Sequence, residues 1–373
     1  MDRHQQRQEQ ASVYAAKKRA YGIVEFVLVA VCFIAAFLFS STVASLFSTL
    51  ISFAAAALYF LIFAAVYFII LFPVQYLKNY LLPKDFGLLK QSFGAWLGAY
   101  IKTPLLVLLL GAAAFGLLYM LIVATPDWWW LWTALLVAVV SFLFSAVFPV
   151  FILPLMYKSH SMPDGRLRDE LQELIKRSQV SVPGIDILEI SEDEDTANAM
   201  MMGIGKTRRI TFSDTLLNSY TQDEIKVICA HELGHVKKAH FTQTLFVSLL
   251  IIMLVFFLTN LTAAAVINLF NVGDITTLSA MPITILLFFV LYSVFMIFSN
   301  IYSRSLEKEA DLYALQLTKD PLSFISMLQK ITDQNLDEEN PHPLIAKLLY
   351  DHPSGADRKA MAERFIEEQT QSY

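Results

Sequence analysis

The chain has 373 residues, of which 56% are hydrophobic and 16% are charged, whereas a soluble domain usually has about 25% charged residues. The charges are unevenly placed, because residues 26–77 contain none while residues 158–238 contain 25 and residues 304–373 contain 21. This distribution excludes a disordered chain and a single soluble core. It predicts a polytopic membrane protein with two water-facing segments, and the net charge of −5 indicates no nucleic-acid partner.

The uncharged runs predict six membrane-spanning helices, so the expected fold class is mainly α. A hydrocarbon core about 30 Å thick needs about 20 apolar residues of helix, and such a segment must satisfy its own backbone polar groups. A short polar turn is expected at residues 40–42, between the first two spans. The expected spans are residues 22–41, 52–75, 104–124, 130–153, 244–269 and 281–302.

The spans also orient the chain and divide it. Nine Arg and Lys residues lie in the N-terminal tail and in the loop between spans two and three, and the three opposite loops have none. Because short cytoplasmic loops carry the excess of positive charge, both termini and both charged segments are expected in the cytoplasm. The parts are an N-terminal membrane bundle (1–157), a charged segment (158–243), two further spans (244–302) and a charged C-terminal segment (303–373).

The charged segments combine helix and strand patterns. Apolar residues recur at helical spacing in residues 164–178, and residues 185–190 and 209–213 have the composition of short strands. Thr221 followed three residues later by Glu224 is a capping-box pattern, which predicts that a helix begins there. In the C-terminal segment, prolines separate three or four helical stretches.

The helix that follows Thr221 contains the sequence HELGH at residues 231–235, an H-E-x-x-H motif. Positions four apart share one face of a helix, so His231 and His235 can bind one metal ion. Zinc suits two imidazole nitrogens and a carboxylate with a fourth position left open, although cobalt or manganese would suit similar residue types. Zinc lowers the pKa of water, and Glu232 lies beside the histidines to take the proton. The motif lies outside the apolar runs, which argues against a site buried within a span.

The third ligand must come from elsewhere in the chain. A metzincin would have a glycine and a histidine at the positions that Lys238 and Phe241 occupy, so that class is excluded. His240 is five residues past His235 and would point off the ligand face of the helix, so we expect a structural or interfacial role for it.

A carboxylate on a later helix can complete the site. After spans five and six the chain returns to the same side of the membrane at residues 303–311, where Glu307 and Asp311 share one helical face. Glu307 can bind the metal while Asp311 accepts the N–H of a ligand histidine. Glu309 is expected to point elsewhere. An acidic helical face is normally solvated, so the residues alone leave open the alternative that Glu307 and Asp311 face solvent.

With these motifs the sequence resembles the type I CAAX prenyl endopeptidase family, which consists of integral-membrane zinc metalloproteases of the gluzincin group. HELGH alone is shared by many zinc proteases, but its combination with the E-x-x-x-D pair and an N-A-x-x-x-G segment is far more specific. Eukaryotic members have seven spans, one more than expected here. The matching segments are residues 84–93, 148–171, 198–217, 231–235, 303–311 and 351–358.

The resemblance implies a cytoplasmic zincin-like metalloprotease domain that contains a small β-sheet. It implies one zinc ion per chain, held by His231, His235 and Glu307, with Glu232 as the general base. A multi-pass protein of a bacterial cell membrane is the expected setting.

The resemblance also implies residues that contact the substrate. Asn198 and Ala199 would pair with its backbone, as an extended peptide can add to an exposed strand edge. His352 and Arg358 would stabilise the tetrahedral oxyanion. From the residues alone, a helix cap for His352 and a solvated helical arginine at position 358 are the favoured interpretations.

We therefore expect a membrane-embedded zinc metalloendopeptidase that hydrolyses peptide bonds by metal-activated water. Its partners would be the lipid bilayer and a peptide or protein substrate that is membrane-associated or prenylated at its C-terminus. A protease that trims damaged membrane proteins is one alternative. A membrane scaffold or transporter with a relict metal site is another, although no charged residue lies deep in a predicted span, which disfavours an ion transporter.

Overall fold

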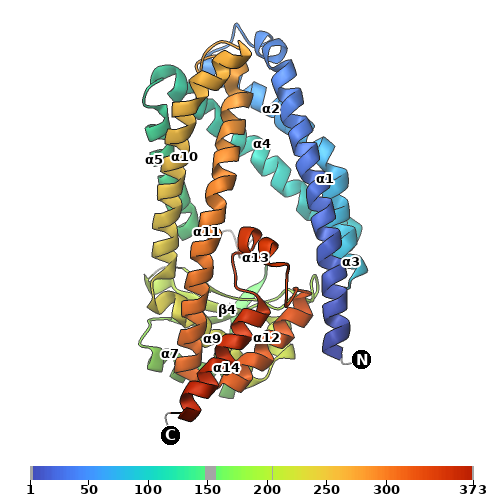
Figure 1. Ribbon diagram of the computed structural model, residues 1–373, viewed down its shortest axis with the longest axis vertical. Helices are drawn as coiled ribbons and strands as arrows, with labels where there is room; N and C mark the ends of the chain where they lie inside the picture. The colour runs from blue at the N-terminus through green and yellow to red at the C-terminus, as the bar shows by residue number, and fades with distance from the viewer. Residues whose placement is uncertain (1–2, 148–156, 204, 372–373) are drawn as a thin grey trace.

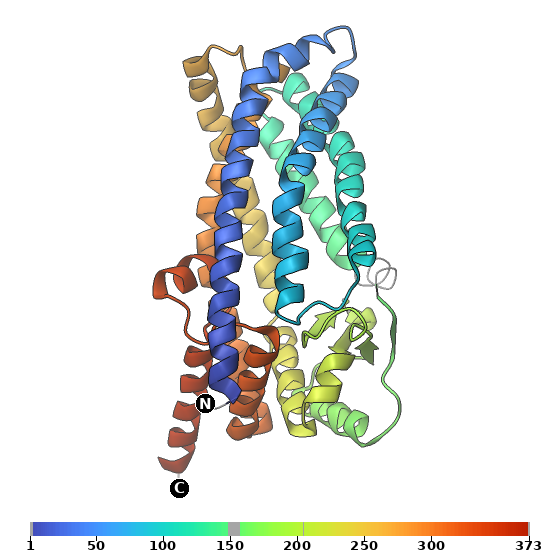
Figure 2. The same ribbon diagram turned by 90° about the vertical axis from the view of Figure 1, so that its right-hand side faces the viewer.

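The computed structural model describes residues 3–147, 157–203 and 205–371. Its long helices run along the long axis, and both termini lie at one end together with a small sheet and several shorter helices (Figures 1 and 2). We call this end the sheet end. Among the described residues, five helices are long and apolar enough to cross a membrane. They are α1 (Arg3–Ser45), α2 (Ser52–Tyr76), α4 (Phe93–Ala124), α10 (His240–Phe270) and α11 (Met281–Thr318).

These helices confirm the prediction of a mainly α-helical polytopic membrane protein. The fourth expected span, 130–153, corresponds to the shorter apolar helix α5 (Trp129–Val147), and its last residues lie outside the described part of the chain. The turn predicted at residues 40–42 is wrong, because α1 continues through it. The Ser40 hydroxyl donates a hydrogen bond of 2.7 Å to the carbonyl of Phe37, so this polar side chain is satisfied within the helix.

The two longest of the described helices, α1 and α11, extend into the sheet end. At about 1.5 Å per residue, the 38 residues of α11 extend about 57 Å, almost twice the thickness of a hydrocarbon core. α11 therefore crosses the expected boundary at residue 302 without a break and carries residues 303–318 to the sheet end. α1 also reaches this end, where Arg19 forms an ion pair of 2.6 Å with Glu338.

The sheet has four strands in the order β1-β2-β4-β3, with β2 and β4 parallel and the two outer pairs antiparallel. Strands β2 and β4 confirm the two predicted strands, whereas the sequences of β1 (SHS) and β3 (AMMM) are too short and too uniform to show an alternating pattern. This order places β3 at an edge of the sheet. The strands are β1 (Ser159–Ser161), β2 (Gly184–Leu188), β3 (Ala199–Met202) and β4 (Arg209–Ser213).

Shorter helices pack around the sheet. They enclose an apolar core that includes Leu171, Phe212, Leu233 and Phe324, each of which is fully buried. Burying one such side chain contributes about 1.5–3 kcal/mol, so this core is a main source of stability for the sheet end. The shorter helices of this core are α7 (Arg166–Ser178), α8 (Asp214–Ser219), α9 (Gln222–Lys237), α12 (Pro321–Asn335) and α14 (Gly355–Gln371). Two further short helices, α3 (Leu82–Asp85) and α13 (Pro343–Leu349), contribute no residue to it.

The helix that carries the HELGH sequence packs closely on α11. The predicted capping box is confirmed at the start of α9, where Thr221 and Glu224 bond to each other's backbone amides. Further along α9, a methyl group added to Gly234 would lie 3.1 Å from the Cα of Ala310. The missing side chain at Gly234 therefore permits close approach of the two backbones, which brings α9 to residues 307–311 of α11.

Candidate active site

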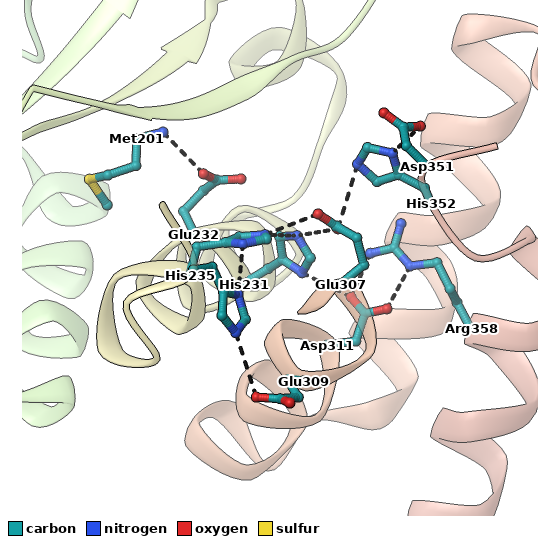
Figure 3. A network of polar contacts seen from close by, with 11 residues as sticks. Met201, His231, Glu232, His235, Glu307, Glu309, Asp311, Asp351, His352 and Arg358 are labelled. Carbon is teal, nitrogen blue, oxygen red and sulfur yellow. Dashed lines mark hydrogen bonds and ion pairs between the residues drawn. The ribbon is translucent and has the colours of Figure 1, made fainter. Parts of the chain in front are cut away.

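Two histidines and a distant glutamate form the centre of the site (Figure 3). His231 and His235 lie one turn apart on α9, with their Nε2 atoms 3.1 Å apart. Glu307 reaches them from α11, with Oε2 3.3 Å from His231 Nε2 and Oε1 3.5 Å from His235 Nε2. The three side chains offer ligand atoms that all lie within 4.8 Å of one another, as binding of a single metal ion requires.

This set of donor atoms fits a divalent cation. The Oε2 atom of Glu307 is buried, and the described residues provide no hydrogen bond of good geometry to it. Burial raises the pKa of Glu307, but the neighbouring imidazoles outweigh this effect, so the pKa is lowered and the carboxylate is ionised. Two imidazole nitrogens and one carboxylate oxygen form a common metal-ligand set that leaves a coordination position open.

The side of His231 that faces away from Glu307 contacts a buried ion pair. Its Nδ1 atom lies 2.9 Å from Oδ1 of Asp311, a residue that is fully buried. Arg358, from α14, donates hydrogen bonds of 2.7 and 2.6 Å to the two oxygens of Asp311. Although burial raises the pKa of Asp311, Arg358 and His231 hold it well below its usual range. Asp311 is thus an ionised acceptor for the ring N–H of His231.

Glu232 lies between the metal-ligand set and the edge of the sheet. Its Oε2 atom accepts a hydrogen bond of 3.0 Å from the backbone amide of Met201 in β3. Burial raises the pKa of Glu232 to about 7. A carboxyl group with a pKa near neutrality can both accept and release a proton, as a general base in hydrolysis must.

Asn198 and Ala199 lie at the start of β3, on the same cavity. The cavity has a volume of about 660 Å³ and is lined by these two residues together with His231, Glu232 and Glu307. The backbone of Asn198 is bonded to Ser213 of the neighbouring strand, which fixes its position. An extended peptide in this cavity would therefore lie beside the sheet edge and α9.

His352 and Arg358 also line this cavity. His352 precedes α14, and its Nε2 atom lies 3.5 Å from Glu307 Oε2 while its Nδ1 atom lies 2.9 Å from Asp351. The Asp351 carboxylate raises the pKa of His352, although burial acts in the opposite direction. Arg358 is 16% exposed at its side chain, so the alternative of a solvated arginine is wrong.

His240 and Glu309 lie closer to the site than the sequence suggested. We expected His240 to point off the ligand face because we continued α9 through it, but α9 ends at Lys237 and Ala239 adopts a φ of +56°. This turn returns His240 to a position where its Nδ1 atom lies 3.0 Å from Nδ1 of His235. Glu309 does not reach the metal-ligand set, but it lies 3.6 Å from His240 Nε2.

Other residues at or near the site gave no signal in the sequence. The backbone amide of Met201 belongs to a strand without an alternating pattern. Lys18 and Arg19 of α1 also line the cavity, although they precede the HELGH sequence by more than 200 residues. Only long-range packing brings such residues to the site, so neither motif nor periodicity could have found them.

Comparison with known proteins agrees with this geometry. The family model described as "Peptidase family M48" matches residues 161–365, which is more than half of the chain. The chain belongs to this family. Residues 2–158 match a second family model, described as "CAAX prenyl protease N-terminal, five membrane helices". The M48 chain is therefore a multi-pass membrane metalloprotease, and its predicted membership of the CAAX prenyl endopeptidases is confirmed.

Individual relatives of this M48 chain come from bacteria and eukaryotes. An uncharacterised metalloprotease of Bacillus subtilis is 28% identical over 295 residues, which cover 77% of this chain and 68% of that protein. CAAX prenyl protease 1 of Saccharomyces cerevisiae is 28% identical over 305 residues, which cover 77% of this chain and 67% of that protein. The crystal structure of Ste24p from S. mikatae matches with a TM-score of 0.84 at 23% identity, covering 95% of this chain and 88% of that chain. The present chain shares that fold.

Proposed function

We propose that this M48 protein is a zinc endopeptidase that binds one zinc ion per chain. One observation carries the proposal: the carboxylate of buried Glu307 faces an imidazole nitrogen with each of its oxygens, directly beside Glu232, and its Oε2 atom has no hydrogen bond of good geometry from the described residues. Burial lowers the pKa of His231, but the Asp311 and Glu307 carboxylates outweigh this effect and raise it to about 10. The surroundings of this ring thus favour a positive charge, which a bound cation supplies.

The ligands in this proposal are His231, His235 and Glu307, and zinc is the metal that best suits two nitrogens and one carboxylate oxygen. The ion would act as a Lewis acid and polarise the scissile carbonyl. Glu232 would take a proton from the attacking water and deliver it to the leaving nitrogen. Its raised pKa supports both transfers. Asp311 would orient His231 by accepting its Nδ1–H.

The substrate would lie along β3. Ala199 would pair with its backbone, because β3 is an edge strand and this residue lines the cavity. Asn198, whose backbone is bonded to Ser213, would bind the substrate backbone through its side-chain amide. His352, with its raised pKa, and the Nη1 group of Arg358, which Asp311 does not engage, would stabilise the oxyanion of the tetrahedral intermediate.

The substrate class follows from relatives and from the position of the site. CAAX prenyl protease 1 of yeast supports membrane-associated or prenylated C-terminal peptides as substrates. The cavity is lined by Lys18 of α1 and Lys78 beside α2, so it adjoins the helices of the membrane bundle. The nine-to-zero distribution of positive charge supports a cytoplasmic position for the active site and both termini.

The test uses the full-length protein purified in detergent. We expect about one zinc per chain, and we expect cleavage of a farnesylated CAAX peptide that stops when a chelator removes the metal. Glu232→Gln should keep the zinc and lose cleavage, whereas Glu307→Ala should lose both. Glu173→Gln, an exposed glutamate on α7, is the matched control and should change neither.

Three results would contradict parts of the proposal. Cleavage by the Glu232→Gln variant would exclude Glu232 as the base. Full zinc content in the Glu307→Ala variant would exclude this residue as the third ligand. Cleavage of an unfolded membrane protein in preference to the farnesylated peptide would replace the proposed substrate class with that of a quality-control protease.

A further inference from the structure

The two ligand histidines are held on their rear sides in different ways. The Nδ1 atom of His231 faces the carboxylate of Asp311 (Figure 3), whereas the Nδ1 atom of His235 lies 3.0 Å from Nδ1 of a second imidazole, that of His240. A ligand histidine usually donates its other N–H to a carboxylate, a backbone carbonyl or water. An imidazole in this position is therefore unusual and calls for a physical explanation.

The separation of the two Nδ1 atoms determines where the hydrogens lie. At 3.0 Å, one nitrogen must donate and the other must accept, because two N–H groups or two lone pairs would repel each other. The Nε2 atom of His235 faces Glu307 and needs its lone pair for the metal. Hence His235 carries its hydrogen on Nδ1 and donates it to His240.

The same reasoning fixes the state of His240. Its Nδ1 atom accepts from His235, so its hydrogen is on Nε2, which lies 3.6 Å from Oε2 of Glu309. This Nε2 atom is buried and has no hydrogen bond of good geometry among the described residues. Glu309 is about half exposed and is the acidic group that faces it. The contacts therefore form a series that runs from Glu309 to His240 and from His240 to His235, which is itself a proposed metal ligand.

The backbone builds this arrangement at the point where α9 passes into α10. Ala239 adopts a left-handed conformation, which is unfavourable for a residue with a side chain. It bends the chain between α9 and α10, so that His240, the first residue of α10, packs against the preceding helix with 2% of its surface exposed. The conformation is maintained by the packing of α10, and it places the His240 ring behind His235.

We propose that His240 is a positioning residue that holds His235 as the Nδ1–H tautomer in the orientation required for metal binding. The assignment rests on the proposed function, because it concerns a ligand of the same metal ion. His240 does not contact the metal or the substrate. It acts through His235, as Asp311 acts through His231, but as a neutral acceptor rather than a charged one.

The test compares three substitutions at position 240 by metal affinity. The oxygen of an asparagine side chain occupies the place of a histidine Nδ1, whereas that of glutamine corresponds to Nε2. His240→Asn should therefore keep the zinc dissociation constant within about threefold, and His240→Gln and His240→Leu should raise it about 10–100-fold. The constant is measured on full-length protein by competition with a chelator. The visible spectrum of the cobalt-loaded protein reports the ligand environment independently.

Folding is monitored by the thermal unfolding midpoint of each metal-free protein. His240→Asn and His240→Gln both insert an amide, so their comparison stands even if His240→Leu fails to fold. Equal zinc affinity and equal cobalt spectra in these two amide variants would overturn the assignment while leaving the proposed function intact. Wild-type protein that binds neither zinc nor cobalt would overturn the proposed function and the assignment together.

Discussion

Replacing Asp311 with leucine separates its effect on the fold from its effect on the metal site. Asp311 is fully buried and contacts two groups, the Nδ1–H of His231 and the guanidinium of Arg358. Asp311→Leu removes the acceptor and leaves the arginine as an unpaired charge in a buried position. The double variant Asp311→Leu/Arg358→Met removes the unpaired charge as well.

The expected magnitudes differ for stability and for metal binding. Breaking a buried ion pair by removing one partner costs about 3–5 kcal/mol, whereas replacing both partners with apolar residues of similar volume is often nearly neutral. Since the Arg358 side chain is 16% exposed, we expect the single variant near the lower end, about 3 kcal/mol, and the double variant near wild type. Loss of a partner of a ligand histidine weakens metal binding about 10–100-fold, or about 1.4–2.8 kcal/mol, and this loss should persist in the double variant.

Two measurements on the full-length protein check this reasoning. The thermal unfolding midpoint of the metal-free protein reports stability, and chelator competition gives the zinc dissociation constant. We expect the double variant to recover the unfolding midpoint but not the zinc affinity. If zinc affinity recovers together with stability, then Asp311 serves only to neutralise Arg358, and the idea that it orients His231 is refuted.

Two further predictions concern the sheet end. Glu224→Ala should destabilise the protein by about 2–4 kcal/mol, seen as a lower unfolding midpoint, because Glu224 both completes the capping box with Thr221 and binds Lys330 of α12 at 2.7 Å; a change below 0.5 kcal/mol would contradict this role. Burial lowers the pKa of His4, but the Asp333 carboxylate and that of Glu339 outweigh it, so the pKa is raised. The contribution of His4 to docking of α1 is therefore complete below pH 6.5 and is lost as the pH rises through the raised value. Hydrogen exchange of residues 3–12, corrected for intrinsic rates, should increase over that range in wild type but not in His4→Gln, and equal pH profiles would exclude His4 as the cause.

The predictions that succeeded rest on short-range rules. The spacing of four residues places His231 and His235 on one face because a helix has 3.6 residues per turn. The capping box at Thr221 depends on atoms three residues apart, and it is present as expected. Apolar runs identified the long helices because a bilayer imposes a minimum length on any span. The wrong prediction of a turn at residues 40–42 shows where these rules stop being reliable. A serine or threonine hydroxyl can form a hydrogen bond within a helix as readily as it can end one.

Residues far apart in the chain meet only through packing. Glu307 reaches the histidines because α10 and α11 form a long helical hairpin and because Gly234 permits close approach of α9 to α11. The Met201 amide reaches Glu232 only because β3 pairs with β4.

The amino-acid sequence by itself determined the positions of the long apolar helices, the helix start at Thr221, and a pair of histidines able to share a metal ion, because each depends on hydropathy or on spacing within a few residues. The tertiary structure alone decided that Arg358 binds Asp311 and that the chain bends at Ala239 to bring His240 behind His235. A local pattern cannot specify these contacts, because their geometry depends on how whole helices pack. The packing energy also offsets the free-energy cost of unfavourable backbone conformations such as that of Ala239.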